Sequence, residues 1–381
     1  MMRILTAGES HGPYMVAILE GFPKGVKIEE KFIDQELKRR MSGLGRGKRM
    51  QIEKDKVEIL AGLRNKYTLG SPIAVAVKNK DTKIFPQKKD NLAPLVIPRP
   101  AHADLAGALK YQETDIRNIL ERASARETVC RVALGAICKQ FLLLFGIKIA
   151  SFTVRVGKVC STKKPHNISE VIRKGRTSKL NCIDREKERL MAQEIKRAEK
   201  DMDSLGGVAE VWIEGVPVGL GSFMSFEKRL DARLSSCLMS IPAVKGVEIG
   251  LGFEYAHRRG SKSHDAIEYC KRKGFLHPTN NAGGIEAGIS TGSPIVLRVA
   301  MKPIATLRKP LDSVNLLTKK SQKASVVRSD TCAIVACGVI AESMSAFVLT
   351  EVFLEKFGCD TSREIKANYQ AYLKHLKNTL L

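Results

Sequence analysis

The sequence predicts an α+β fold: a single large domain, a β-α-β sandwich with a helical layer between two antiparallel sheets and an internal pseudo-twofold repeat. A Gly-Ser-Pro-Ile tetrapeptide at 70–73 recurs at 292–295, and each copy begins an apolar strand. Each strand is followed, after a loop, by an apolar helix with the skeleton Thr-x3-Val-Ala-x-Gly-x-Ile, at 128–137 and 331–340. Two patterns that recur in the same order indicate related halves. Chance similarity of short apolar segments is the alternative.

The two apolar helices account for the layered arrangement. The helix expected at 127–145 is apolar nearly all round, as is the helix expected at 332–357. Such helices need cover on more than one side, and small residues at matching positions let them pack closely. A helical layer between two sheets satisfies both needs. We therefore expect one domain over residues 1–381, with repeat halves at about 1–150 and 208–358.

The remaining elements follow from the periodicity of apolar residues. A polar, lysine-rich segment at 79–95, broken by Pro86 and Pro94, is expected to be a long mobile loop that covers a site. The charged region at about 165–205 is expected to be peripheral and helical, with a solvated surface. Strands are predicted at 4–6, 14–20, 57–61, 73–77, 149–156, 208–213, within 240–250 and at 295–301, and further helices at 31–41, near 104, at 184–200, at 226–239 and at the C-terminus.

Charge and cysteine usage limit the class of protein. Lys and Arg number 64 against 40 Asp and Glu, a formal charge of +24, so the surface attracts anions such as nucleic acid, acidic lipid or a phosphorylated metabolite. Nine cysteines lack the paired spacing of zinc or redox sites, which predicts buried free thiols in a reducing compartment and no metal site. No apolar run of 18 residues is evident, so neither a signal peptide nor a membrane span is expected, and we place the protein in the cytoplasm.

Two histidines lie in predicted turns. His11 lies between Gly8 and Gly12 directly after the first strand, and His102 lies in the segment 99–104 before a short helix. Glycine lets the backbone take positive φ and lets a ligand approach, while imidazole titrates near neutrality and suits proton transfer. A single loop histidine is more often a surface or structural residue. A catalytic role for either histidine is therefore supported only when other functional residues lie near it.

Two basic segments are candidate anion sites. Alternating glycines at 42–50 carry Arg46, Lys48 and Arg49, and the segment 122–128 places two arginines at the start of a helix. Guanidinium groups and helix N-termini suit carboxylate or phosphate. On spacing alone, a solvated basic loop is the better interpretation of 42–50, since no strand leads into it and no helix follows it.

Six of these segments together resemble the chorismate synthase family, in the family's order and over nearly the whole chain. Any one is short, and the six together are specific. The matching blocks are Gly8-Glu9-Ser10-His11-Gly12, Gly43-x-Gly45-Arg46-Gly47-x-Arg49-Met50, Arg99-Pro100-Ala101-His102-Ala103-Asp104, Ala125-Arg126-Glu127-Thr128, Ala243-Val244-Lys245-Gly246-Val247-Glu248 and Arg328-Ser329-Asp330-Thr331-Cys332.

The resemblance implies a lyase reaction: anti-1,4-elimination of phosphate from 5-enolpyruvylshikimate 3-phosphate to give chorismate, the last step of the shikimate pathway toward aromatic amino acids. It also implies a need for reduced FMN, which lends an electron transiently to the substrate. NADPH is a possible external reductant, and some family members carry their own NAD(P)H:flavin reductase activity. The family's β-α-β sandwich and homotetramer agree with the predicted repeat, and the basic excess fits a pocket for several anionic groups.

The resemblance also assigns roles by matching position. His11 would protonate the departing phosphate, His102 would protonate reduced flavin near N1, and Asp330 would assist proton removal through flavin N5 with Ser10 beside it. Substrate-binding residues would be Arg40, Arg46, Arg49 and Arg126. FMN contacts would be Arg122, Ala123, Ser124, Pro242, Ala243, Ala287, Lys302, Pro303, Ile304, Ala305, Thr306 and Arg328.

The sequence departs from the family pattern at two positions, and two alternative functions remain to be distinguished. Ala101 and Ala287 stand where the family usually has glycine, and each adds a methyl group where backbone approaches ligand. A basic nucleic-acid-binding protein is the main rival, and it would show steep salt dependence and no need for two loop histidines. An ordinary flavin oxidoreductase is the other, and it would show net turnover of NAD(P)H. The enzyme reading implies no nucleic-acid partner and no membrane partner.

Overall fold

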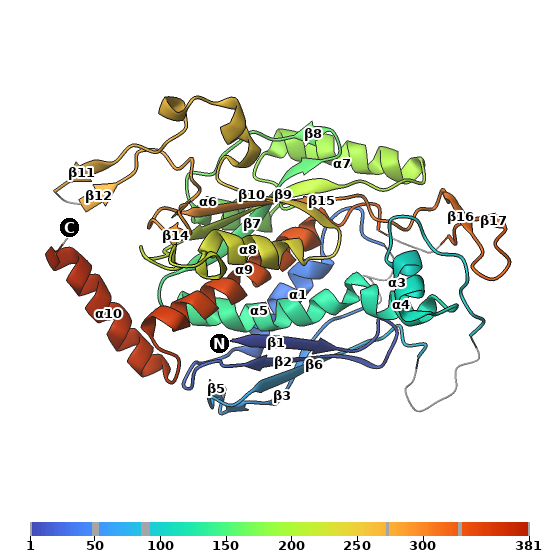
Figure 1. Ribbon diagram of the computed structural model, residues 1–381, viewed down its shortest axis with the longest axis horizontal. Helices are drawn as coiled ribbons and strands as arrows, with labels where there is room; N and C mark the ends of the chain where they lie inside the picture. The colour runs from blue at the N-terminus through green and yellow to red at the C-terminus, as the bar shows by residue number, and fades with distance from the viewer. Residues whose placement is uncertain (1, 48–52, 85–91, 272–273, 327–329, 380–381) are drawn as a thin grey trace.

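Two antiparallel sheets frame the protein, which we describe from a computed structural model (Figure 1). The structure describes every residue except 1, 48–52, 85–91, 272–273, 327–329 and 380–381. The four-stranded sheet has the order β1-β2-β6-β3, with bounds Arg3–Ala7, Tyr14–Glu20, Ile73–Lys78 and Val57–Ala61. The five-stranded sheet has the order β10-β15-β9-β7-β8, with bounds Val244–Ile249, Ile295–Met301, Gly207–Glu214, Lys148–Val156 and Val159–Cys160.

Helices fill the space between the sheets and cover the outer face of the larger one (Figure 1). Helix α5 packs against β2 and β6, α9 packs against β7 and β9, and α6 and α7 lie on the other side of β7. Helix α8 packs on α9 and β10, and α10 packs on α9. The bounds are α1 Glu30–Met41, α3 Asp104–Tyr111, α4 Arg117–Ala123, α5 Thr128–Leu143, α6 Ile168–Arg176, α7 Arg185–Lys200, α8 Leu230–Met239, α9 Ile334–Phe357 and α10 Ser362–Thr379.

Short hairpins and 3₁₀ segments lie outside the two main sheets. Four hairpins stand outside the main sheets: β4 with β5 (Leu63–Arg64, Tyr67–Thr68), β11 with β12 (Glu268–Cys270, Gly274–Leu276), β13 with β14 (Ile285–Glu286, Ile289–Ser290) and β16 with β17 (Asp312–Val314, Ser321–Lys323). Short 3₁₀ segments occur at η1 Ala125–Glu127, η2 Phe226–Lys228, η3 Gly252–His257 and η4 Gly260–Lys262.

Most predicted elements match the structure, with two corrections. The expected helix at 226–239 is interrupted, because a 3₁₀ turn precedes α8. The expected helix at 127–145 is shorter, and the separate helix α4 ends just before it, so Arg122 lies in the last turn of α4 rather than at the start of α5. The β16–β17 hairpin, which the sequence did not indicate, is an addition to the predicted elements. The pseudo-twofold relation between the halves stays a prediction.

Helix α9 is the central core helix of the chain. By length and composition it could cross a membrane, with a mean hydropathy of 1.6, contrary to the expectation that no segment qualifies. However, 89% of this apolar stretch is buried inside the protein. The amino acids of α9 are apolar on all sides because other elements cover it on all sides.

Close packing of α5 on α9 depends on Gly135. A Cβ atom added to Gly135 would lie 2.3 Å from Ser343 Cβ and 2.6 Å from Ser343 Cα, far inside van der Waals contact. Gly338, at the equivalent position of the second helix, instead faces β7, where an added Cβ would lie 2.7 Å from Ser151 Oγ. The shared glycine therefore permits a helix–helix contact in one half and a helix–sheet contact in the other.

A buried ion network joins α1, α5 and α9. Glu342, with no exposed surface, accepts hydrogen bonds from Arg39 Nη2 at 2.6 Å and from Ser151 Oγ at 2.6 Å, and is bound by Lys139. Glu36 is bound by the same two cations. Burial alone would raise the pKa of Glu342, but the charges of Arg39 and Lys139 outweigh it and hold that pKa well below its usual range.

The network predicts a loss of stability in acid. Because the Glu342 pKa is lower in the folded than in the unfolded chain, its contribution is fully present above the ordinary value of about 4.5 and falls as pH falls below it. We expect the urea midpoint to decrease between pH 5 and pH 3, roughly where glutamate titrates when unfolded. Glu342→Gln should show a shallower decrease over the same interval. Equal slopes for the two proteins would contradict this assignment.

All nine cysteines are free thiols, and five of them are buried. Burial raises the pKa of Cys130, Cys138 and Cys337 to about 12, so these thiols stay protonated and unreactive at neutral pH. Cys359 alone is exposed. The prediction of buried free thiols is thus confirmed for the five.

Candidate active site

The turn between β1 and β2 holds His11 against α4. Glu121 of α4 is buried, and its Oε2 accepts the His11 backbone N–H at 2.8 Å while its Oε1 lies 2.8 Å from His11 Nδ1. A carboxylate can only accept, so Nδ1 carries the proton and Nε2 is turned toward the other side of the ring. Asp81 Oδ2 lies 3.7 Å from that Nε2. One carboxylate therefore fixes both the backbone and the imidazole of His11.

Ser10 is buried beside the same helix. Its backbone N–H donates to the carbonyl of Glu121 at 3.0 Å, and its Oγ lies 3.1 Å from Ser124 Oγ. Arg122, the next residue of α4, donates to the carbonyl of Thr6 at 2.8 Å and to that of Gly8 at 3.4 Å. The structure thus brings together His11, Ser10, Arg122 and Ser124, which come from two separate sequence blocks.

The first part of the predicted 79–95 loop lies on the His11 turn. Asn79 Nδ2 donates to the carbonyl of Gly12 at 2.7 Å, and the backbone N–H groups of Lys83 and Ile84 donate to the carbonyl of His11. The described ends of the loop contain neither helix nor strand. The middle of the loop, 85–91, lies outside the described residues.

Two buried arginines continue the site from Asn79. Arg126 Nε donates to Asn79 Oδ1 at 2.8 Å, and its Nη1 binds both oxygens of Asp55 at 2.8 and 2.9 Å. Arg40 binds the same carboxylate more loosely, at 3.5 Å, and donates to Thr128 Oγ1 at 3.0 Å. The pKa of Arg40 is lowered to about 10, mainly by burial and also by the charges of Arg126 and Arg46, against the opposing effect of Asp55. Three cations are therefore crowded in one buried region.

Asp330 joins this region through Arg46. Arg46 Nη1 lies 2.8 Å from Asp330 Oδ2, and the backbone N–H of Gly47 donates to Oδ1 at 2.6 Å. Arg46 Nε is a buried donor with no hydrogen-bond acceptor among the residues that the structure describes. Arg126 Nη2 also has no hydrogen-bond acceptor among them, and the nearest carboxylate oxygen paired with it, Glu53 Oε2, lies 3.7 Å away. Unsatisfied buried donors are costly, so their presence here favours a site for an anion.

His102 has its own buried carboxylate. Asp104, with no exposed surface, lies 2.5 Å from His102 Nδ1, and Arg99 binds Asp104 through Nε at 2.8 Å and Nη2 at 3.1 Å. Burial would raise the pKa of Asp104, but hydrogen bonds from His102 and Arg99 hold it well below its usual range. Asp104 therefore stays ionised and orients the imidazole.

The segment 302–306 lies beside His102. Lys302 Nζ donates to the carbonyl of Ala101, and Arg99 Nη1 donates to Thr306 Oγ1 at 3.1 Å. The backbone N–H of Lys302 donates to the carbonyl of Ala243, which has a φ of +70°. Ala305 lines a small recess with Arg99 and Pro100. These contacts place predicted cofactor residues of the segment 302–306 against the His102 turn, and Ala243 against Lys302.

The His11 and His102 groups meet through α3 and α4. A Cβ added to Gly107 of α3 would lie 2.3 Å from Ile119 Cγ2 of α4, so the two helices touch at this glycine. Within the described ranges, no hydrogen bond or ion pair joins His11, His102 and Asp330 directly. Arg49 and Arg328, both predicted to bind ligand, lie outside the described residues. In the described part of the chain, neither histidine forms a hydrogen bond with Ala123, Pro242, Pro303 or Ala287.

Both departures from the family pattern have left-handed backbone. Ala101 has a φ of +62° and Ala287 a φ of +47°. Ala287 and Gly288, at +81°, form the two-residue loop between β13 and β14, a turn that needs positive φ at both positions. Alanine costs more than glycine in this conformation because its Cβ crowds the following carbonyl oxygen. The two methyl groups therefore store backbone strain.

Ala287→Gly should raise the free energy of unfolding by up to about 1 kcal/mol, because relief of left-handed strain exceeds the added entropy of the unfolded chain. Chemical denaturation measures the difference. Ala367→Gly is the matched control: Ala367 is exposed on the right-handed helix α10, so this change should lower stability by about 0.5–1 kcal/mol. A destabilising effect at both positions would show that Ala287 is not strained.

Sequence reasoning missed the carboxylates that orient the histidines. Asp104 ends the block that contains His102, and Glu121 directly precedes Arg122, yet neither was assigned a role. The signal available was an acidic residue within a few positions of each motif. Asn79 and Asp55 had no such signal, because only the tertiary fold brings them to Arg126.

The fold and the site together define a class: a mixed helix-and-sheet domain whose site is equipped to hold anions and to orient two imidazoles. The sequence profile described as chorismate synthase matches residues 2–354. The chain belongs to the chorismate synthase family, a family of enzymes.

Individual relatives cover the full chain. A chorismate synthase of Geobacter metallireducens is 47% identical over 392 residues, spanning 99% of this chain and all of the relative. One of Pelobacter propionicus is 49% identical over 391 residues with the same coverage. A solved structure titled Crystal Structure of Chorismate Synthase aligns with a TM-score of 0.81 and 41% identity, over 99% of this chain and 98% of that one.

Proposed function

We propose that the protein eliminates phosphate from 5-enolpyruvylshikimate 3-phosphate in an anti-1,4 sense to give chorismate, with reduced FMN, as the last step of the shikimate pathway. Family membership over residues 2–354 carries the proposal. The charge of +24 and the buried arginines support a substrate with two carboxylates and a phosphate. The enzyme would be a carbon–oxygen lyase, cytoplasmic and a homotetramer.

The residues present fit reduced FMN and an anionic substrate. The unsatisfied donors Arg46 Nε and Arg126 Nη2 suit substrate anions. The segment 302–306 with Ala243 and Arg122 to Ser124 would hold the cofactor, with Arg328 and Ala287 contributing as the resemblance implies. Reduced FMN, when bound, supplies an electron transiently to the substrate. NADPH would serve as an external reductant.

His11 would act as the general acid toward the departing phosphate. Glu121 keeps Nδ1 protonated and orients the ring, so that Nε2 is the nitrogen available to hold and deliver a proton. His102, oriented by Asp104, would protonate the reduced cofactor. Asp330 is held by Arg46 and Gly47, and with Ser10 it would assist removal of the substrate proton.

The proposal is tested by phosphate release under anaerobic conditions. With reduced FMN, the enzyme should release phosphate from the enolpyruvyl substrate without stoichiometric consumption of flavin, and a change in the FMN spectrum should accompany substrate binding. Oxidised FMN is the control and should support no turnover. Net oxidation of NAD(P)H in step with product would favour an oxidoreductase instead. Salt-dependent binding of nucleic acid without phosphate release would favour the nucleic-acid alternative.

Glu121→Gln should reduce kcat by about 10–100-fold with little change in KM, as expected when a residue orients a catalytic group. Glutamine has one acceptor oxygen, so it cannot accept from both the backbone N–H and Nδ1 of His11. Nitrogen-15 NMR should show neutral His11 protonated at Nε2 in this variant and at Nδ1 in the parent. An unchanged tautomer with a lower rate would mean that Glu121 acts only through folding.

A further inference from the structure

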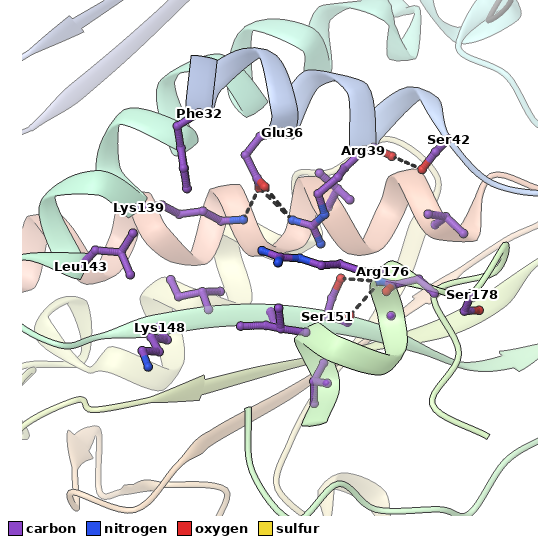
Figure 2. A pocket seen from close by; sticks show the side chains of 18 of the residues that line it. Phe32, Glu36, Arg39, Ser42, Lys139, Leu143, Lys148, Ser151, Arg176 and Ser178 are labelled. Carbon is purple, nitrogen blue, oxygen red and sulfur yellow. Dashed lines mark hydrogen bonds and ion pairs between the residues drawn. The ribbon is translucent and has the colours of Figure 1, made fainter. Parts of the chain in front are cut away.

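A cavity of about 530 Å³ lies between α1, α5, α9, β7 and α6 (Figure 2). None of the residues predicted to bind substrate or cofactor lines it. The cavity is within the size range of small-molecule sites in proteins. It is therefore a candidate site separate from the one proposed above.

The walls combine an apolar surface with polar groups at one side. Phe32, Ile149, Val171, Val335 and Val339 supply apolar surface from four different elements. Small-molecule sites are typically apolar with a few placed polar groups that fix orientation. This composition suits a ligand that has both an apolar body and a polar end.

Positive charge remains after the lining groups are paired. Arg39 and Lys139 are balanced by Glu36 and the adjacent Glu342. Arg176, by contrast, has no hydrogen bond or ion pair with any residue that the structure describes, and Figure 2 shows its side chain reaching from α6 into the cavity.

Lys148 at the edge of the cavity likewise has no side-chain partner within the described residues. Arg176 and Lys148 are therefore two cations without a carboxylate partner in the described part of the chain, and they favour an anionic ligand over a cationic or neutral one.

We propose that this cavity binds a small arene carboxylate, with its carboxylate on Arg176 and its ring on the apolar wall. A guanidinium binds a carboxylate with two parallel hydrogen bonds, so Arg176 suits the acid group, while Phe32 and the aliphatic side chains of the wall suit the ring. Inorganic phosphate alone does not suit the cavity, because it has no apolar part to cover the apolar wall.

Trp212, the single tryptophan of the chain, can report on this site. It packs against a hydrophobic cluster that contains Ala150 and Val171, and both of these residues line the cavity. A ligand that enters between α6 and β7 should change the environment of Trp212. Its fluorescence therefore measures binding without any need for turnover, so the test is independent of the proposed catalytic function.

The experiment titrates 3-phenylpropionate into full-length protein saturated with oxidised FMN while Trp212 fluorescence is recorded. We expect a saturable change, with binding at least about tenfold tighter than that of the neutral analogue 3-phenylpropanamide, as a charge-assisted contact predicts. Inorganic phosphate alone should give no change. Equal affinity for acid and amide, or no saturation, would overturn the proposal.

Two charge reversals on one helix locate the anion contact. Arg176→Glu should weaken binding of 3-phenylpropionate at least about tenfold. Arg173→Glu on the same helix removes an exposed arginine that does not line the cavity, and should change affinity less than about twofold. An equal loss of affinity in both variants would mean that only the general surface charge matters. That result would overturn the assignment of the binding site to the cavity. Both residues are exposed, so neither change should prevent folding.

Discussion

His11→Ala should lower the rate of phosphate release by about 10²–10⁴-fold, the range typical of a lost general acid. The imidazole is the group that Glu121 holds at 2.8 Å, and alanine leaves no proton donor at that position. Substrate affinity should change little, because in the proposed function the buried arginines, and not His11, make the contacts to the substrate anions. Steady-state phosphate release with reduced FMN measures the effect.

Controls separate chemistry from folding at His11. His166→Ala changes an exposed histidine outside the site and should leave the rate unaltered. His102→Ala should also lose much of the rate, since it removes the second oriented imidazole. Circular dichroism and unfolding midpoints of both site variants should match the parent. Full activity in His11→Ala and His102→Ala would show that the proton donors are wrongly assigned.

Lys139→Met should lower the free energy of unfolding by about 3–5 kcal/mol, the cost of removing one partner from a buried ion network. Lys139 is bound to both Glu36 and Glu342, and without it the two carboxylates share only Arg39. The two buried carboxylates would repel each other, and Lys139 would no longer offset the cost of removing them from water. Urea unfolding at neutral pH measures the loss.

A partly exposed ion pair provides the matched control for Lys139. Lys174 pairs with Glu170 four residues earlier on α6, an arrangement worth about 0.3–0.5 kcal/mol. Lys174→Met should therefore have a small effect. A second variant that also replaces Glu36 by Gln should recover part of the loss of Lys139→Met, because it removes one of the stranded charges. A change below about 1 kcal/mol in Lys139→Met would contradict the network's role.

Much of the framework could be predicted from apolar periodicity. The strands at 14–20, 57–61 and 295–301 have the predicted bounds, because alternating residues of each strand face different environments. The failures lie where local signals are weak. The helix α4 is short and follows a polar segment, and the β16–β17 hairpin consists of polar residues, so neither has the pattern of a half-buried element.

The motifs of the site could be predicted from the sequence, but the side-chain contacts that join them could not. The turn that holds His11 contains glycine and proline, and the turn that holds His102 follows two prolines, so this local composition is visible in sequence. The link from Asn79 through Arg126 to Asp55 joins residues far apart in the chain, so no spacing rule indicates it. Similarly, the cavity at Arg176 forms from five elements whose adjacency only the fold supplies.

The contact between Gly135 and Ser343 bears on how the chain folds during synthesis. The two residues are separated by most of the sequence, yet their backbones touch in the centre of the molecule. The N-terminal half therefore emerges from the ribosome with one side of α5 uncovered, and the interior closes only once α9 has been translated. We expect nascent chains that stop before α9 to need a chaperone to remain in solution.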